Sequence, residues 1–235
     1  MEVIILAGGF GKRLKKSVSN VPKPMAPIRG TPFIELLIKF LIRQGVSRVI
    51  LSLGYMADAF INYFGKSVNG IEIIYSVEDE PLGTGGALLK AYQYLSGTQT
   101  FIVLNGDTFF DINLQDIFTF HQSKKADMSM AVFRVNTEGR YDILTFNADK
   151  RVLAIGKKAA IGWANSGILM LSPHILKDFA LGFRNSMISL EADLLSILVD
   201  RGDLNIYAYE GQGLFVDIGV PEDYTKAQRV IPDLG

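Results

Sequence analysis

The chain of 235 residues carries 24 lysines and arginines against 24 aspartates and glutamates, so its formal net charge is zero. A balanced charge removes the electrostatic basis for a dedicated nucleic-acid-binding protein. The sequence has no cysteine, which excludes disulfides and cysteine metal sites and fits a cytoplasmic protein. With 49% hydrophobic residues and no apolar stretch long enough to span a membrane, it predicts an ordinary globular chain that does not enter the membrane.

The first half of the chain alternates strand and helix patterns. Residues 2–7 form an apolar run typical of a buried parallel strand. Thr31 and Pro32 predict a helix start, as a cap followed by a proline at the first helical position, and Gly45 ends that helix. The other elements expected here are strands at 48–53, 71–76 and 101–104 and helices at 57–64 and 84–95. This order implies right-handed crossovers and a doubly wound sheet.

The second half mixes strands with short turns and fewer helices. The expected strands are 127–135, 143–147, 151–155, 165–171, 204–209 and 214–217. The expected helices are a short one opened by Ser172 and Pro173, a longer one at 190–201 and a last one at 221–229. The whole pattern predicts an α/β fold with a Rossmann-like, mixed and mostly parallel sheet, in a single domain over residues 1–235.

The segment 6–27, LAGGFGKRLKKSVSNVPKPMAP, follows the first strand directly. Gly8, Gly9 and Gly11 let main-chain N–H groups approach a phosphate with no Cβ in the way. Arg13 and Lys23 add positive charge beside them. The segment therefore predicts a loop that folds over a nucleoside triphosphate. A tight turn with both cations solvated is the plain alternative.

Two better-known phosphate motifs do not fit this loop. A dinucleotide fingerprint needs a third glycine where this chain has Leu14, and it opens directly into a helix, which the prolines after it prevent. A P-loop needs Ser or Thr after its Gly-Lys pair, where Arg13 stands. A nicotinamide-dependent oxidoreductase is therefore excluded.

Two aspartates come directly after apolar strands that lie far apart in the sequence. Asp107 follows LNG, and Asp217 ends FVD before Ile218 and Gly219. Open α/β sheets bind ligands at the carboxyl ends of their strands, and Mg²⁺ prefers one or two carboxylates together with substrate phosphates. The pair therefore predicts a shared magnesium site. Asp107 alone is also compatible with an ordinary turn hydrogen bond.

A glycine-rich turn, Glu80 to Gly86 (EPLGTGG), leads into the helix expected at 84–95. Its backbone groups are free to cradle a flat base, but a flexible connector has the same composition. The sequence leaves these alternatives open.

The motifs together resemble the sugar-1-phosphate nucleotidyltransferases. LAGGFGKRL, PKPMAP, PLGTGGAL, LNGDTFFD and FVDIGVPEDY follow in that family's order over nearly the whole chain. VSNVPKPMAPI, LSLGYMADAFINYFG and SLEADLL are most similar to the bacterial D-glycero-α-D-manno-heptose 1-phosphate guanylyltransferases, with mannose-1-phosphate guanylyltransferases next. The resemblance implies transfer of GMP from GTP to a sugar 1-phosphate, with release of pyrophosphate.

The resemblance also implies roles for individual residues. The nucleotide-binding half covers about 1–110 and the acceptor half about 111–235. Arg13 and Lys23 are expected to clamp the reacting phosphates, and Asp107 and Asp217 to hold Mg²⁺. The expected nucleotide-binding residues are Leu6, Ala7, Gly8, Gly9, Gly11, Gly83 and Thr84. The expected sugar-phosphate-binding residues are Lys158, Asn165 and Glu191.

Three positions depart from the family pattern, and all fall on the acceptor side. Asp142 stands where relatives have glycine, Lys157 where they have glutamate, and Ser166 where a second glycine is common. These departures keep other acceptor sugars, and a non-catalytic relative that only binds nucleotide or sugar phosphate, as alternatives. The partners expected are therefore a nucleoside triphosphate and a sugar 1-phosphate, and a homo-oligomer stays open.

Overall fold

The structure is a computed structural model that describes residues 1–9, 21–97, 99–136, 140–182 and 187–234. The strands of its first half are β1 (Glu2–Leu6), β2 (Pro27–Ile28), β3 (Thr31–Pro32), β4 (Arg48–Leu53), β5 (Ser67–Val68), β6 (Ile71–Val77), β7 (Phe101–Asn105) and β8 (Thr108–Phe110). The helices of this half are the 3₁₀ turn η1 (Lys23–Met25), α1 (Phe33–Arg43), α2 (Ala57–Phe64) and α3 (Gly83–Tyr92).

The second half contributes the remaining elements. Its strands are β9 (Met128–Val135), β10 (Asp142–Phe146), β11 (Val152–Lys158), β12 (Gly162–Leu171), β13 (Ile206–Glu210) and β14 (Phe215–Asp217). Its helices are α4 (Leu114–Ser123), α5 (His174–Gly182), the π-helical segment η2 (Leu190–Leu195), α6 (Ser196–Asp200) and α7 (Pro221–Val230).

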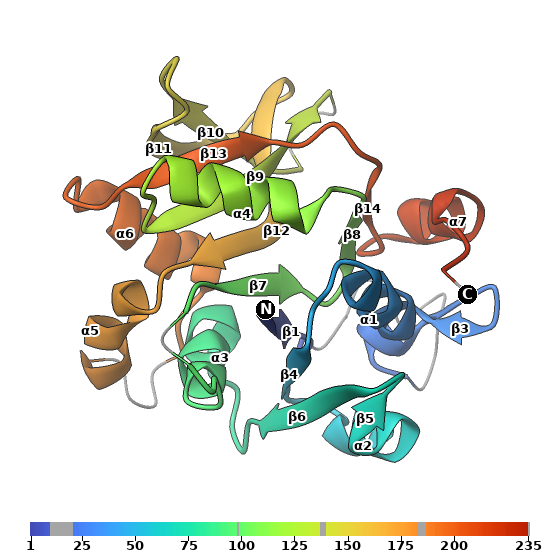
Figure 1. Ribbon diagram of the computed structural model, residues 1–235. Coiled ribbons are helices and arrows are strands. Elements are labelled where there is room, and N and C mark those ends of the chain that lie inside the picture. The colour runs from blue at the N-terminus through green and yellow to red at the C-terminus, as the bar shows by residue number, and fades with distance from the viewer. Residues whose placement is uncertain (10–20, 98, 137–139, 183–186, 235) are drawn as a thin grey trace.

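One mixed sheet runs through the molecule, in the order β11-β10-β12-β7-β1-β4-β6-β5, and β9 joins β12 and β13 beside it (Figure 1). The central strands β7, β1, β4 and β6 are parallel, whereas β12 runs antiparallel to β7 and to β9. The carboxyl ends of the four parallel strands lie at one edge of the sheet, which is the edge at which doubly wound folds bind ligands. The predicted α/β fold with a mixed sheet is confirmed.

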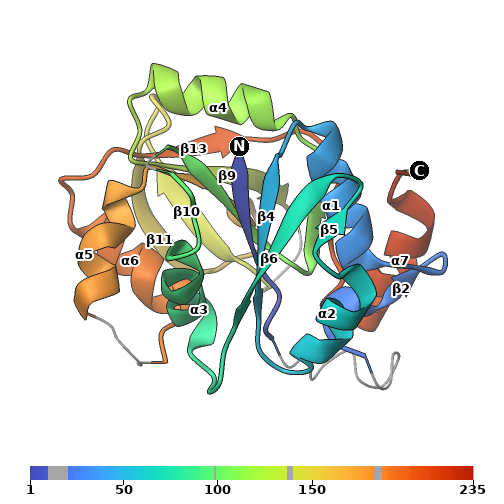
Figure 2. The same cartoon turned by 60° about the horizontal axis from the view of Figure 1, so that its bottom comes forward.

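Helices cover both faces of the sheet, with α1 and α2 on one side and α3, α5 and α6 on the other (Figure 2). Alternate residues of one strand serve opposite faces, because side chains alternate along a strand. In β1, Val3 and Ile5 join the hydrophobic cluster under α1, and Ile4 joins the cluster under α3. This double burial explains why the central strands read as continuous apolar runs.

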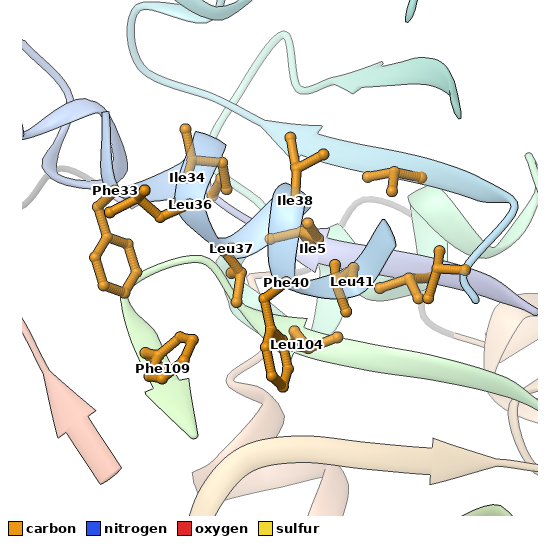
Figure 3. Packing of buried hydrophobic residues seen from close by; sticks show 14 of the residues in the cluster. Ile5, Phe33, Ile34, Leu36, Leu37, Ile38, Phe40, Leu41, Leu104 and Phe109 are labelled. Carbon is orange, nitrogen blue, oxygen red and sulfur yellow. The ribbon is translucent and has the colours of Figure 1, made fainter. Parts of the chain in front are cut away.

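A small two-stranded sheet, β8 with β14, is fixed to the core on the α1 side. Phe109 of β8 is fully buried, and its ring lies edge-on to Phe40 with the ring centroids 5.1 Å apart. Figure 3 shows Phe33 and Phe40 reaching from α1 toward Phe109. The β8–β14 pair is therefore held by core packing, not only by its own hydrogen bonds.

Two details of the predicted helices are corrected by the structure. Pro32 is not the first helical residue, because Thr31 and Pro32 form β3 and pair with β2, and the Phe33 N–H donates to Ala26 O across this hairpin. Helix α1 consequently begins at Phe33 with no side-chain cap. The helix expected at 190–201 is present, but its first part is π-helical.

Helix α4 was not among the expected elements. It is capped by Asn113, whose side chain accepts a hydrogen bond from the Gln115 N–H. Among the described residues, no helix has both the length and the apolar character needed to cross a membrane.

Truncation of Phe109 to alanine is expected to lower the free energy of unfolding by about 3–5 kcal/mol, because it leaves a cavity against Phe40 in a close-packed core. Urea unfolding followed by circular dichroism measures this loss. The matched truncation Tyr94→Ala, at a residue that is 41% exposed, is expected to cost far less. Equal losses for the two variants would contradict the packing role of Phe109.

Candidate active site

Asp107 and Asp217 lie side by side because β8 and β14 pair antiparallel. The register places Asp217 opposite Thr108, and the Ile218 N–H donates to the main-chain oxygen of Asp107 at 3.0 Å. The backbone alone therefore brings together two residues that are 110 positions apart in the sequence.

Lys23 lies between these two carboxylates. Its ammonium forms an ion pair with Asp107 Oδ2 and lies 3.5 Å from Asp217 Oδ1. The side chain is only 11% exposed, and it projects from the 3₁₀ turn η1, where Lys23 stands between Pro22 and Pro24. Because the two carboxylates face the same ammonium group, they are close enough to bind one metal ion together.

Asp217 is further held by residues that the sequence analysis did not assign. Arg140 donates to Asp217 Oδ2 at 2.9 Å and also pairs with Asp223 in the first turn of α7. Tyr141 Oη lies 3.4 Å from the same Asp217 oxygen. Asp223 belongs to the motif FVDIGVPEDY, but nothing in the sequence pattern indicates that Arg140 and Asp223 meet.

The surroundings of Asp217 keep its carboxylate charged. Burial acts to raise the pKa of Asp217, but the charge of Lys23, the hydrogen bond and charge of Arg140, and the Gly219 N–H outweigh it, so the pKa lies below its usual value. A carboxylate that stays ionised remains available to a cation throughout the neutral pH range.

The end of β1 approaches neighbouring backbone closely. A Cβ on Gly8 would lie 3.0 Å from the Gly54 nitrogen, so any other residue would require the neighbouring backbone to shift. Gly9 is exposed and has open space around its Cα. Gly11 and Arg13 lie outside the described residues, so their predicted roles stay predictions.

The turn before α3 is closed by the segment around Ile188. Gly83 has φ of +72°, and a Cβ there would lie 2.4 Å from Ile188 O. Thr84 Oγ1 accepts from the Leu190 N–H at 2.7 Å and lies 3.3 Å from Glu191 Oε2. The glycine-rich turn therefore packs closely against the segment around Ile188.

Glu78 is a further carboxylate that the sequence analysis did not assign. It follows β6 at the same sheet edge and is half-buried. Its Oε2 accepts from the Leu82 N–H at 2.9 Å, and its Oε1 faces Gly8. Burial raises the pKa of Glu78, although the Leu82 hydrogen bond and the charge of Lys90 oppose the rise. The sequence pattern could have identified Glu78, because this residue, like Asp107, comes after an apolar strand.

Two cavities meet at Asp107 and Lys23, and Asp217 lines the second of them. The first has a volume of about 440 Å³ and the second about 450 Å³. Predicted nucleotide-binding residues line the first cavity: Leu6, Ala7, Gly8, Gly9, Gly83 and Thr84. Residues that line both cavities are Lys23, Asn105, Asp107 and Glu191. The arrangement offers two adjoining compartments with the charged cluster at their boundary.

The second cavity contains most of the predicted acceptor residues. Asn165 lines it and accepts from the Gly167 N–H at 3.0 Å, and Glu191 lines it from η2. Asp142 and Ser166 also line this cavity. For Lys158 the structure gives the backbone only, which pairs with Asp142.

The chemistry of Asp107 and Asp217 fits a magnesium ion. In the described part of the chain, no group of three or more His, Cys, Asp or Glu side chains is arranged to hold a metal. Mg²⁺ does not require such a cage, since it binds through one or two carboxylates, substrate phosphates and water. The two aspartates provide that set once phosphates are present.

Known proteins similar to this chain are nucleotidyltransferases. The nucleotidyl transferase family model matches residues 2–233. A D-glycero-α-D-manno-heptose 1-phosphate guanylyltransferase of Aneurinibacillus thermoaerophilus is 39% identical over 231 residues, which cover 97% of each chain.

Solved structures are equally similar over the full length. The crystal structure of HddC from Yersinia pseudotuberculosis superposes with a TM-score of 0.84 at 37% identity, covering 98% of this chain and 99% of that one. The same protein complexed with GMP-PN gives a TM-score of 0.82 at 35% identity and the same coverage. With a family match from end to end and relatives of this similarity, the chain belongs to the nucleotidyl transferase family.

Proposed function

We propose that the protein transfers GMP from GTP to D-glycero-α-D-manno-heptose 1-phosphate, forming a GDP-heptose and pyrophosphate. The observation that carries this proposal is the ion-pair cluster of Lys23 and Asp107, which line both cavities, with Asp217, which lines the second. The boundary of the two cavities is where the reacting groups of two anionic substrates would have to meet. The full-length similarity to heptose 1-phosphate guanylyltransferases supports the choice of both substrates.

The first cavity suits the nucleotide. We assign its phosphates to the backbone of Gly8, Gly9 and Gly11, with Arg13 and Lys23 supplying positive charge. Leu6, Ala7, Gly83 and Thr84 would border the nucleoside. Glycines at such positions expose N–H groups that stabilise negative charge as it develops on phosphate oxygens.

Glu78 suits guanine in particular. Guanine presents two adjacent N–H donors on its Watson–Crick edge, N1–H and the 2-amino group, and a carboxylate is an acceptor for both. One oxygen of Glu78 is held by the Leu82 N–H, which fixes the orientation of the carboxylate in the cavity lining. Uracil and thymine offer a single ring N–H, so they would leave part of this acceptor unpaired in a half-buried place.

The second cavity suits the sugar 1-phosphate. We assign Asn165 and Glu191 to the sugar and Lys158 to its phosphate. Asp142 and Ser166 line the same cavity, so they are positioned to affect which sugar is accepted.

The reaction needs positioning and charge neutralisation more than acid–base chemistry. A phosphate oxygen of the sugar attacks the α-phosphorus of GTP, the new P–O bond forms, and the bond to the β-phosphate oxygen breaks with its electrons going to pyrophosphate. The nucleophile is already an anion, so no base has to remove a proton. Lys23 and Arg13 would reduce the repulsion between the two anions. Mg²⁺ held by Asp107 and Asp217 would neutralise phosphate charge.

A cytoplasmic location accords with these substrates and with the absence of cysteine.

Purified protein with Mg²⁺ is expected to release pyrophosphate from GTP when D-glycero-α-D-manno-heptose 1-phosphate is present. A grid of GTP, ATP, CTP, UTP and dTTP against heptose, mannose and glucose 1-phosphates, read by pyrophosphate release and mass spectrometry of the nucleotide sugar, tests both choices. Product only from another base or sugar would correct the substrate. Nucleotide binding without any product would favour a non-catalytic binding protein.

Asp107→Asn is expected to lower kcat by about 10²–10³-fold, the size of loss seen when one group that stabilises transition-state charge is removed. Steady-state kinetics at saturating GTP measure it. Asp111→Asn is the control, because Asp111 is an exposed aspartate close by in the sequence that lines neither cavity. Wild-type turnover in Asp107→Asn would refute its role at the reacting phosphates.

Glu78→Gln is expected to raise the KM for GTP roughly ten- to a hundredfold, because a hydrogen bond to a charged group is worth about 1.5–3 kcal/mol. Competition between GTP and UTP should shift toward UTP in the same variant. Asp79→Asn is the matched control, since the neighbouring Asp79 carboxylate is 98% exposed and its ion pair, with Lys90, is a long one of 3.5 Å. If both variants discriminate between the nucleotides like the wild type, Glu78 does not read the base.

A further inference from the structure

The ammonium of Lys23 occupies the space between the two carboxylates assigned to Mg²⁺. It forms an ion pair with Asp107 and is 3.5 Å from Asp217 Oδ1. A divalent cation that bridged both aspartates would need the same space and the same oxygens. The lysine and such a cation therefore compete for one position.

The surrounding chain makes room for this arrangement. A Cβ on Gly219 would lie 2.9 Å from Lys23 Nζ and 2.7 Å from Asp217 Oδ1, so a larger residue there would require these side chains to shift. The 3₁₀ turn η1 directs the lysine inward, where its side chain is 11% exposed.

Asp217 has one oxygen available for this exchange. Its Oδ2 accepts from Arg140, which is itself paired with Asp223. Its Oδ1 accepts from the Gly219 N–H at 2.7 Å and faces Lys23. Arg140 already binds Asp217 Oδ2. A cation that enters would therefore have to replace Lys23 at Asp217 Oδ1 and at the Asp107 carboxylate.

We propose that Lys23 blocks the divalent cation from Asp107 and Asp217 until nucleotide phosphates draw the lysine away. This inference rests on the proposed function for the identity of the phosphates. Its consequence is that the metal and the nucleotide bind cooperatively, and the cation alone binds weakly.

The cooperativity follows from competition. When a binding-competent arrangement is populated only in part, the apparent dissociation constant rises by the inverse of that fraction. Phosphates that hold Lys23 elsewhere increase the fraction in which the carboxylates are open. By linkage, the cation then favours nucleotide binding by the same factor.

A purely structural ion pair makes a different prediction. If Lys23 only neutralises two partly buried carboxylates, its removal destabilises the fold and does not improve metal binding. Competition instead predicts that removal opens a site with two unneutralised carboxylates, and so metal binding strengthens.

The test is a titration of the full-length protein with Mn²⁺, with no nucleotide or sugar, read by the electron paramagnetic resonance signal of free Mn²⁺. Lys23→Met is expected to bind Mn²⁺ at least about tenfold more tightly than the wild type, since a neighbouring cation changes the affinity of a carboxylate for a proton by a factor of this size or more. Lys23→Gln, which keeps a polar tip, is expected to show the same gain.

Two further variants locate the effect. Lys23→Met combined with Asp107→Asn is expected to lose the gain, because one carboxylate of the site is gone. Lys150→Met is the matched control, since Lys150 pairs with Glu210 at 2.7 Å and lines neither cavity. It should leave Mn²⁺ binding unchanged. Circular dichroism melts establish that each variant is folded.

Unchanged or weaker Mn²⁺ binding in folded Lys23→Met or Lys23→Gln would overturn the inference. A gain that persists in the double variant would also overturn it, because the cation would then bind elsewhere. The titration contains no GTP and no sugar phosphate. Tighter Mn²⁺ binding with no nucleotide sugar formed by the wild type would therefore refute the proposed function and leave the competition standing.

Discussion

The pairing of Asp107, Lys23 and Asp217 is the interaction on which the rest of the site depends. The three residues come from distant parts of the chain, and two like charges brought together in a partly buried place repel unless a cation lies between them. The antiparallel contact of β8 with β14 fixes the carboxylates, and η1 delivers the ammonium. Core packing around Phe109 supports the β8–β14 pair, so the charged cluster rests on a well-packed base.

The sheet gives this cluster two compartments. The parallel strands β7, β1, β4 and β6 end at one edge, where Glu78 and the Gly8 backbone line the first cavity. Strands β10 and β12, from the antiparallel part of the sheet, line the second cavity. The contact of Gly83 with Ile188 joins the walls contributed by the two halves. One fold thus presents two adjoining cavities to a single charged boundary.

The sequence predicted those residues of the candidate site that stand at the end of a strand. Asp107 and Asp217 stand at the ends of apolar runs, which is why the pattern predicted that they share a site. The contact that brings them together is the antiparallel pairing of β8 with β14, which the pattern did not predict. Arg140 and Asp223 could not be found this way, because their pairing depends on where α7 packs. The start of α1 was misplaced by one residue since the β2–β3 hairpin extends through Pro32, which local propensity does not reveal.

Glu191 lines both cavities, and its carboxylate lies 3.3 Å from the Thr84 hydroxyl at the start of α3. A change at this position in the course of evolution would alter both cavities at once. Asp142 and Ser166 line the second cavity and not the first. Under the proposed function, a change at Asp142 or Ser166 would therefore affect the sugar alone, whereas a change at Glu191 would affect the sugar and the nucleotide together.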